Sequence, residues 1–87
     1  MSDETLLKFP CAFPIKVMGE NALMFEKLVV DTILIHAPDF DPASVSVRES
    51  KGGKFLAITA TFTAHSKMQI DAIYQALSKH PSVKMAL

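Results

Sequence analysis

The sequence contains little of what marks several specialised classes of protein. It has no tryptophan, only three glycines and a single cysteine among 87 residues. Cys11 therefore has no partner for an internal disulfide bond, and a reducing, cytoplasmic location is expected. The acidic start, Met1–Glu4, lacks the basic region that opens a signal peptide. No apolar run approaches the roughly 20 residues that a membrane-spanning helix requires.

The chain also lacks a surplus of either charge. Nine Lys and Arg residues balance nine Asp and Glu residues, and tight non-specific binding to nucleic acid or to an anionic membrane depends on a basic surplus. Both partners are therefore disfavoured. Apolar side chains are plentiful, at 49% of the total, which is enough for one core at this length. Residues 1–11 show no regular period and are expected to form an N-terminal arm, with residues 12–87 as a single domain.

Hydrophobic periodicity divides that domain into six elements. Four segments alternate between apolar and polar residues, as strands do, and two repeat apolar residues every three or four positions, as helices do. The expected order is strand 13–18, helix 22–36, strand 45–48, strand 55–64, a second helix from His65 or Ser66 to residue 80, and strand 83–87. Gly19 is expected to end the first strand and Asn21 to cap the first helix. The glycines of Lys51–Lys54 suit a hairpin turn.

This order predicts the fold. Right-handed crossovers place the first and third strands at the centre of the sheet, with the second and fourth at its edges. We therefore predict the α+β class: a ferredoxin-like two-layer sandwich with βαββαβ order, in which two helices cover one face of a four-stranded antiparallel sheet.

The sheet face away from the helices is the most informative surface. The residues expected on it are Lys16, Met18, Ser46, Arg48, Phe55, Ala57, Thr59, Thr61, Thr63, Lys84 and Ala86. This face is mildly basic and carries a single aromatic residue. RNA-recognition modules of this fold stack bases on two or three aromatic side chains, so RNA binding on the open sheet face is the alternative function rather than the first.

The sequence offers few groups for catalysis. Cys11 has no histidine nearby to activate its thiol, and the histidines form no closely spaced pair with cysteine of the kind that binds zinc. Asp39 and Asp41 lack the glycine and distal glutamate of a calcium loop. Lys51–Lys54 lies between two strands, whereas a phosphate-binding loop lies between a strand and a helix. We therefore expect a non-enzymatic domain without metal or cofactor.

Short motifs along the whole chain carry a family resemblance. They are Phe9–Pro10, Phe13 with Lys16–Gly19, His36–Pro38, Ser50–Gly52 and Val83–Leu87. With these motifs the chain resembles the small bacterial proteins of the DUF493 or YbeD-like family, also called UPF0250. The resemblance implies a βαββαβ fold like that of ACT domains, which sense amino acids for metabolic enzymes, and a link to lipoate metabolism. It implies no established activity.

The resemblance also directs attention to the turn after the first strand. In ACT domains this turn lets a small effector approach the backbone, and Gly19 and Asn21 occupy the matching place here. With the neighbouring exposed positions, the expected contact site is Lys16, Met18, Gly19, Asn21 and Arg48. The expected function is a small regulatory or adaptor domain that binds a protein partner or a small-molecule effector.

Self-association is a further expectation. Met24, Val30 and Leu34 widen the apolar surface of the first helix beyond the stripe that one sheet face covers. The last strand, Val83–Leu87, has only Lys84 to discourage pairing of its edge with another chain. These features predict a weak homodimer or a protein-binding surface.

Overall fold

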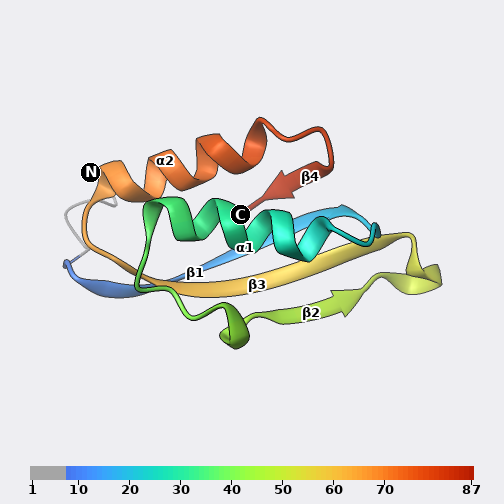
Figure 1. The fold of residues 1–87 in the computed structure, drawn as a ribbon, viewed down its shortest axis with the longest axis horizontal. Helices are drawn as coiled ribbons and strands as arrows, with labels where there is room; N and C mark the ends of the chain where they lie inside the picture. Colours follow the sequence, from blue (N-terminus) through green and yellow to red (C-terminus); the bar gives the residue numbers. More distant parts are fainter. Residues whose placement is uncertain (1–7) are drawn as a thin grey trace.

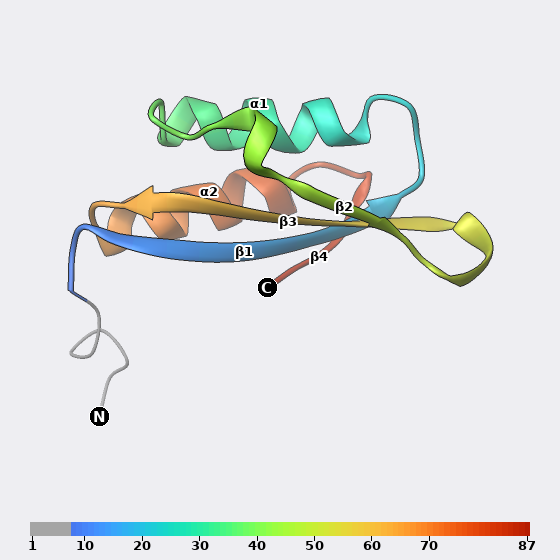
Figure 2. The same ribbon diagram turned by 90° about the horizontal axis from the view of Figure 1, so that it is seen from below.

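The structure is a computed structural model, in which residues 8–87 are described. Its helices and strands follow the order βαββαβ (Figure 1). They are β1 (Cys11–Glu20), α1 (Phe25–His36), β2 (Ser46–Glu49), β3 (Phe55–Ala64), α2 (Lys67–Ser78) and β4 (Val83–Ala86). The antiparallel sheet has the order β2-β3-β1-β4, and both helices lie on one side of it (Figure 2). The predicted ferredoxin-like sandwich is confirmed.

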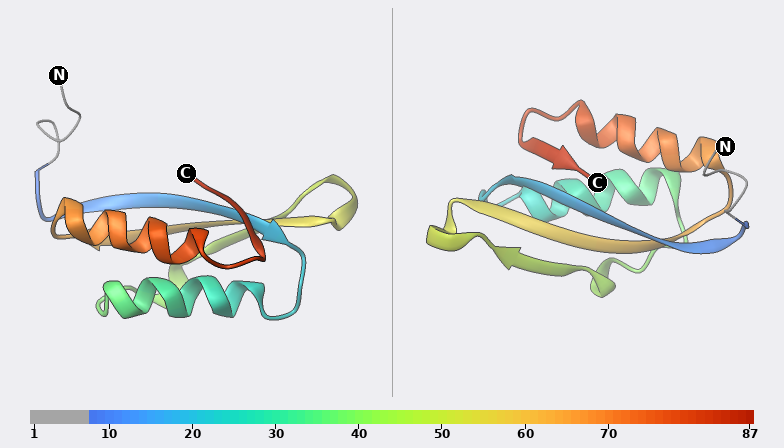
Figure 3. Two further views of the ribbon diagram at one scale, coloured as in Figure 1. Left: turned by 90° about the horizontal axis from the view of Figure 1, so that it is seen from above. Right: turned by 180° about the vertical axis from the view of Figure 1, so that it is seen from behind.

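The two long central strands define the two faces of the sheet. β1 and β3 pair along their whole length, so that Ile15 lies opposite Ala60 and Val17 opposite Ile58. All four side chains are buried beneath the helices, because alternate residues of a strand point to the same face. Even-numbered residues of β1 point to the other face, which neither α1 nor α2 covers (Figure 3, left). We call this uncovered surface the open face.

β1 is longer than the sequence predicts at both ends. It begins at Cys11, inside the expected arm, and continues through Gly19 to Glu20. Of that arm, residues 1–7 lie outside the described residues. Gly19 does not end the strand, because it is buried and pairs with Leu56 of β3.

The start of α1 also differs from the prediction. The helix begins at Phe25, and the N-cap residue before it, Met24, makes no side-chain capping bond. The amide of Asn21 instead donates a hydrogen bond to the carbonyl of Gly53, with an N to O distance of 2.7 Å. Asn21 therefore connects the β1–α1 turn to the β2–β3 hairpin through this hydrogen bond and does not cap the helix. α2 begins at Lys67, one residue after the expected Ser66, whose hydroxyl accepts a hydrogen bond from the backbone N–H of Gln69 and caps the helix.

A bulge in the β1–β4 pairing overturns the expected faces of the last strand. Met18 lies opposite Met85, but Gly19 lies opposite Val83, so Lys84 is an extra residue in β4. An inserted residue inverts the in-and-out alternation on one side of it. Met85 therefore points to the open face, where the prediction placed Ala86.

The apolar surplus expected on α1 is wrong for two of its three members. Val30 is 9% exposed and belongs to the core, and Leu34 is half-buried against that core. Only Met24 is exposed, together with Leu23 and Ile35. Two residues of the loop after α1, Ala37 and Phe40, also belong to the core.

Tyr74 provides a spectroscopic probe of the helix layer, because it is the only tyrosine and no tryptophan is present. Its ring meets that of Phe13 edge-on, with centroids 6.4 Å apart, and burial raises the pKa of its phenol above 10.0. Burial disfavours the charged phenolate in the folded chain but not in the unfolded chain. The folded state is therefore not penalised below the pKa of the unfolded chain, and it loses stability as the pH rises through the pKa of the folded chain. Denaturant unfolding should therefore show stability falling above about pH 10. Tyr74→Phe should remove that part of the fall, and an unchanged pH profile would contradict the assignment.

Candidate functional site

A polar depression of about 150 Å³ lies on the open face near β2. Three neighbouring strands supply its walls: Lys16 comes from β1, Arg48 from β2 and Thr59 from β3, with Ser46 and Ala57 completing the lining. The register explains the grouping, because Lys16 lies opposite Thr59 and Thr59 opposite Ser46. Two cations and two hydroxyls thus converge on one small hollow.

The two cations of this depression are without acidic partners in residues 8–87. The ion pairs in that part of the chain use other lysines, such as Lys27 with Asp31 and Lys84 with Glu20. Lys16 and Arg48 are both exposed. A guanidinium and an ammonium held close together attract carboxylate or phosphate groups, and the guanidinium offers paired donors for either.

An apolar depression of about 330 Å³ lies beside the polar one. Its lining consists of Met18, Phe55, Met85 and the stem of Lys84. Met85 is 48% exposed and Phe55 is 36% exposed. Methionine side chains adapt their shape to a bound partner, and exposed clusters of this kind are common at protein-binding surfaces.

One row of opposed residues joins the two depressions. It crosses all four strands, from Arg48 through Ala57 and Met18 to Met85. Strands lie about 4.8 Å apart, so the row runs from a cationic end to an apolar end over about 14 Å. We call the lining of both depressions the open-face site. Its members are Lys16, Met18, Ser46, Arg48, Phe55, Ala57, Thr59, Lys84 and Met85.

The structure separates the five residues of the predicted contact site. Lys16, Met18 and Arg48 come together in the open-face site. Gly19 and Asn21 do not belong to it. A Cβ on Gly19 would overlap the Ser82 carbonyl and the Phe25 ring, so the space beside this glycine is filled by the protein itself. The Asn21 amide is engaged with Gly53.

Met85 is the member of the open-face site that sequence reasoning missed. The alternation of β4 places it inside, and only the bulge turns it outward. The one available signal was its neighbour Lys84, since a charged residue in a four-residue edge strand is compatible with a bulge.

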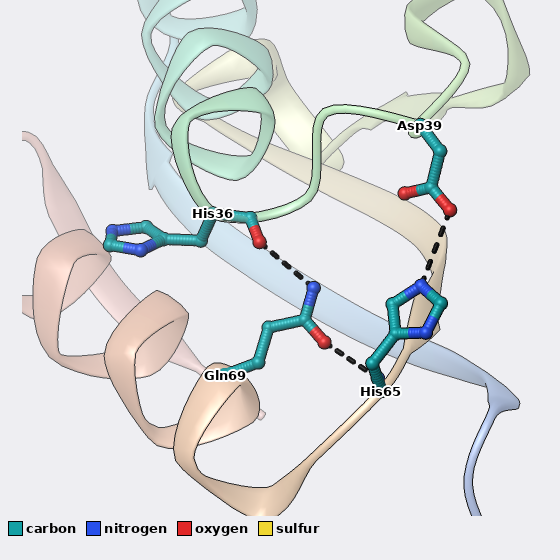
Figure 4. Close-up of polar contacts among 4 residues, drawn as sticks. All are labelled: His36, Asp39, His65 and Gln69. Atoms are coloured by element: carbon teal, nitrogen blue, oxygen red, sulfur yellow. Dashed lines mark hydrogen bonds and ion pairs between the residues drawn. The ribbon is translucent and has the colours of Figure 1, made fainter.

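A second polar cluster lies at the far end of the helix layer (Figure 4). His65 Nε2 lies 3.4 Å from an Asp39 carboxylate oxygen, and the Gln69 side chain bonds both the His65 amide and the His36 carbonyl. The neighbouring Ser66 hydroxyl accepts a hydrogen bond from the backbone N–H of Gln69 and so caps α2. These contacts join the end of α1 to the start of α2, which is a structural role.

Other candidates for chemistry are less developed. Cys11 is half-buried and packs against the core. Across residues 8–87 no three His, Cys, Asp or Glu side chains gather closely enough to hold a metal ion. None of the helices described is long and apolar enough to cross a membrane.

The fold and its open face define a small α+β domain of the ferredoxin-like class, and comparison with known proteins identifies its family. Residues 4–87 match the family described as "Protein of unknown function (DUF493)". A UPF0250 protein of Nitrosomonas europaea is 44% identical over the full length of both chains, and one of Chromobacterium violaceum is 48% identical, also over both full lengths. The chain belongs to the DUF493 (UPF0250) family, as its motifs predicted.

A solved structure supports the fold independently. The solution structure of a protein from H. pylori superposes with a TM-score of 0.77, covering 100% of this chain and 94% of that one. Sequence identity between the two is 15%, so the likeness concerns the fold alone.

Proposed function

We propose that this protein is a non-catalytic adaptor or regulatory module of the cytoplasm that binds an acidic segment of a partner protein through the open-face site. One observation carries the proposal: Lys16 and Arg48, unpaired within the described residues, lie beside an exposed apolar cluster on the sheet face that neither α1 nor α2 covers. An acidic segment with an apolar side chain would neutralise the cations and cover Met18 and Met85 together.

A protein segment fits this surface better than a small effector of the ACT type. The two residues that would open the strand-to-helix turn to an effector are both occupied, Gly19 by packing and Asn21 by its bond to Gly53. The two depressions on the open face adjoin each other across neighbouring strands, which suits an extended ligand. The link to lipoate metabolism implied by the resemblance would then concern the partner, not a bound lipoyl group.

RNA remains the alternative ligand for the same surface. Phe55 is the one exposed aromatic side chain among the open-face residues that line the site, and stacking on a single ring leaves most of the affinity to phosphate contacts. Binding of that kind would weaken steeply with added salt.

Affinity capture with a matched pair of variants tests the proposal. Lys16→Glu with Arg48→Glu should lose at least about tenfold of partner binding, equivalent to ~1.4 kcal/mol. Lys51→Glu with Lys79→Glu changes the net charge equally but lies elsewhere on the exposed surface, and it should retain partners as the wild type does. If both pairs capture the same proteins, the open face is not the binding surface. Nuclease-sensitive capture would favour RNA instead.

The weak homodimer stays a separate prediction. Sedimentation across a concentration series measures it directly, and a strictly monomeric mass at high concentration would contradict it.

A further inference from the structure

The outer edge of β2 is free of partners in residues 8–87. β2 is the first strand of the sheet order and pairs on one side only, with β3. All four of its residues, Ser46–Glu49, are exposed. An edge strand with unused backbone groups is a ready template for another extended chain.

The register identifies which backbone groups point outward. The Ser50 amide bonds the Phe55 carbonyl at 2.9 Å, and bonding alternates along an antiparallel pair. Arg48 and Ser46 therefore bond to β3, while Val47 and Glu49 direct their N–H and C=O groups away from the sheet. Two donors and two acceptors stand along this edge.

The side chains of β2 give the two faces of this edge different chemistry. Arg48 lies on the open face, beside the polar depression. Val47 lies opposite the buried Ile58 and so points to the helix side, yet it is 42% exposed. A strand placed against β2 would cover Val47 on one face and meet Arg48 on the other.

The other edge of the sheet is a poorer template. β4 carries the bulge at Lys84, and a bulge interrupts the even spacing that an added strand needs. On the β2 edge, the carboxylate of Glu49 lies on the helix side and would repel acidic side chains of an added strand on that side. The acidic side chains of an added strand are therefore expected on the open face only.

We propose that the acidic partner segment adds to the free edge of β2 as an extended strand, with acidic side chains on the open face beside Arg48 and apolar side chains on the helix side against Val47. This inference rests on the proposed function and specifies how the part of the partner beside Arg48 binds. Met18 and Met85 lie on the far strands of the sheet and would be covered by another part of the same partner. Backbone bonds to Val47 and Glu49 would supply affinity, and the alternation of acidic and apolar residues would supply specificity.

A peptide of alternating valine and glutamate is the probe, measured by chemical-shift titration of the full chain. Two N-methylated versions, one methylated at every valine and one at every glutamate, decide the mode, because only alternate amides of an added strand face β2. One version should lose at least tenfold in affinity and the other should stay within about threefold. A version with lysine in place of glutamate should also lose at least tenfold.

A protein variant gives a second measurement. Val47→Pro removes an outward N–H that β3 does not use, and proline is tolerated at such edge positions. It should weaken the peptide at least tenfold, whereas Val47→Thr, which keeps the N–H, should stay within threefold. Equal affinity of the two methylated peptides would overturn strand addition even if Val47→Pro does not fold, as would an absence of peptide binding.

The same titration separates this inference from the proposed function. Suppose that Lys16→Glu with Arg48→Glu abolishes partner capture, but the two methylated peptides bind equally well and Val47→Pro binds the peptide as Val47→Thr does. The open-face site then stands, and edge addition is overturned. If capture is also unaffected by the open-face pair, both are overturned.

Discussion

Replacing Gly19 with alanine is expected to destabilise the protein by about 3 kcal/mol, the upper part of the range for an extra methyl in a packed core. The added Cβ would overlap the backbone carbonyl of Ser82 and the ring of Phe25. Phe25 is itself one of the largest fully buried side chains, so it has little room to move. Relief would require β1 to separate from the turn before β4 or α1 to shift.

Urea unfolding of the variant measures this effect, with Gly52→Asn as the control. Gly52 has a φ of 86°, and a Cβ added to it would meet no atom within 4 Å. Asparagine tolerates that left-handed conformation, so the control should change stability by less than about 1 kcal/mol. A Gly19→Ala protein as stable as the control would mean that this glycine serves something other than packing.

The sequence pattern was sufficient for the fold because its signals agree. In β3 every second residue is buried over all ten positions, and Leu56, Ile58 and Ala60 are among the buried ones. The turn glycines Gly52 and Gly53 both adopt positive φ, as the hairpin requires. Local pattern, turn chemistry and connection handedness all indicate one topology.

The failures occurred where tertiary contacts override local pattern. Asn21 is a good N-cap by composition, but the hairpin carbonyl of Gly53 lies within its reach. That proximity depends on the packing of residues 32 positions apart in sequence, which no local window contains. The bulge at Lys84 has the same origin, because its register depends on both β1 and the connection from α2.

The candidate site was predicted in part for a simple reason. Lys16 and Met18 share a face by alternation within β1, and Arg48 joins them once the strand order is known. The apolar half needed more, since Met85 reaches the open face only through the bulge. The charged residues of a sheet face can therefore be predicted from the alternation within each strand. The complete set of residues on that face requires the register of every strand.

The two phenylalanines of β3 offer the sharpest test of those faces. They lie seven residues apart, an odd number, so they point to opposite sides of the sheet. Phe62 is 2% exposed and its ring lies 5.7 Å from that of Phe13, whereas Phe55 is 36% exposed on the open face. Replacing each phenylalanine with alanine therefore tests the core at Phe62 and the open-face site at Phe55.

Phe62→Ala is expected to cost about 3–5 kcal/mol, because it leaves a cavity between the central strands and the helices. Phe55→Ala should cost less than about 1 kcal/mol, since its ring has no burial of that kind to lose. Chemical unfolding measures both, and the same two proteins can enter the partner-capture experiment. There the order should reverse: Phe55→Ala should weaken capture, while Phe62→Ala, wherever it remains folded, should not. Equal stability losses would place both rings in one layer and contradict the open face, because a ring that contributes to the core cannot also be available to a partner.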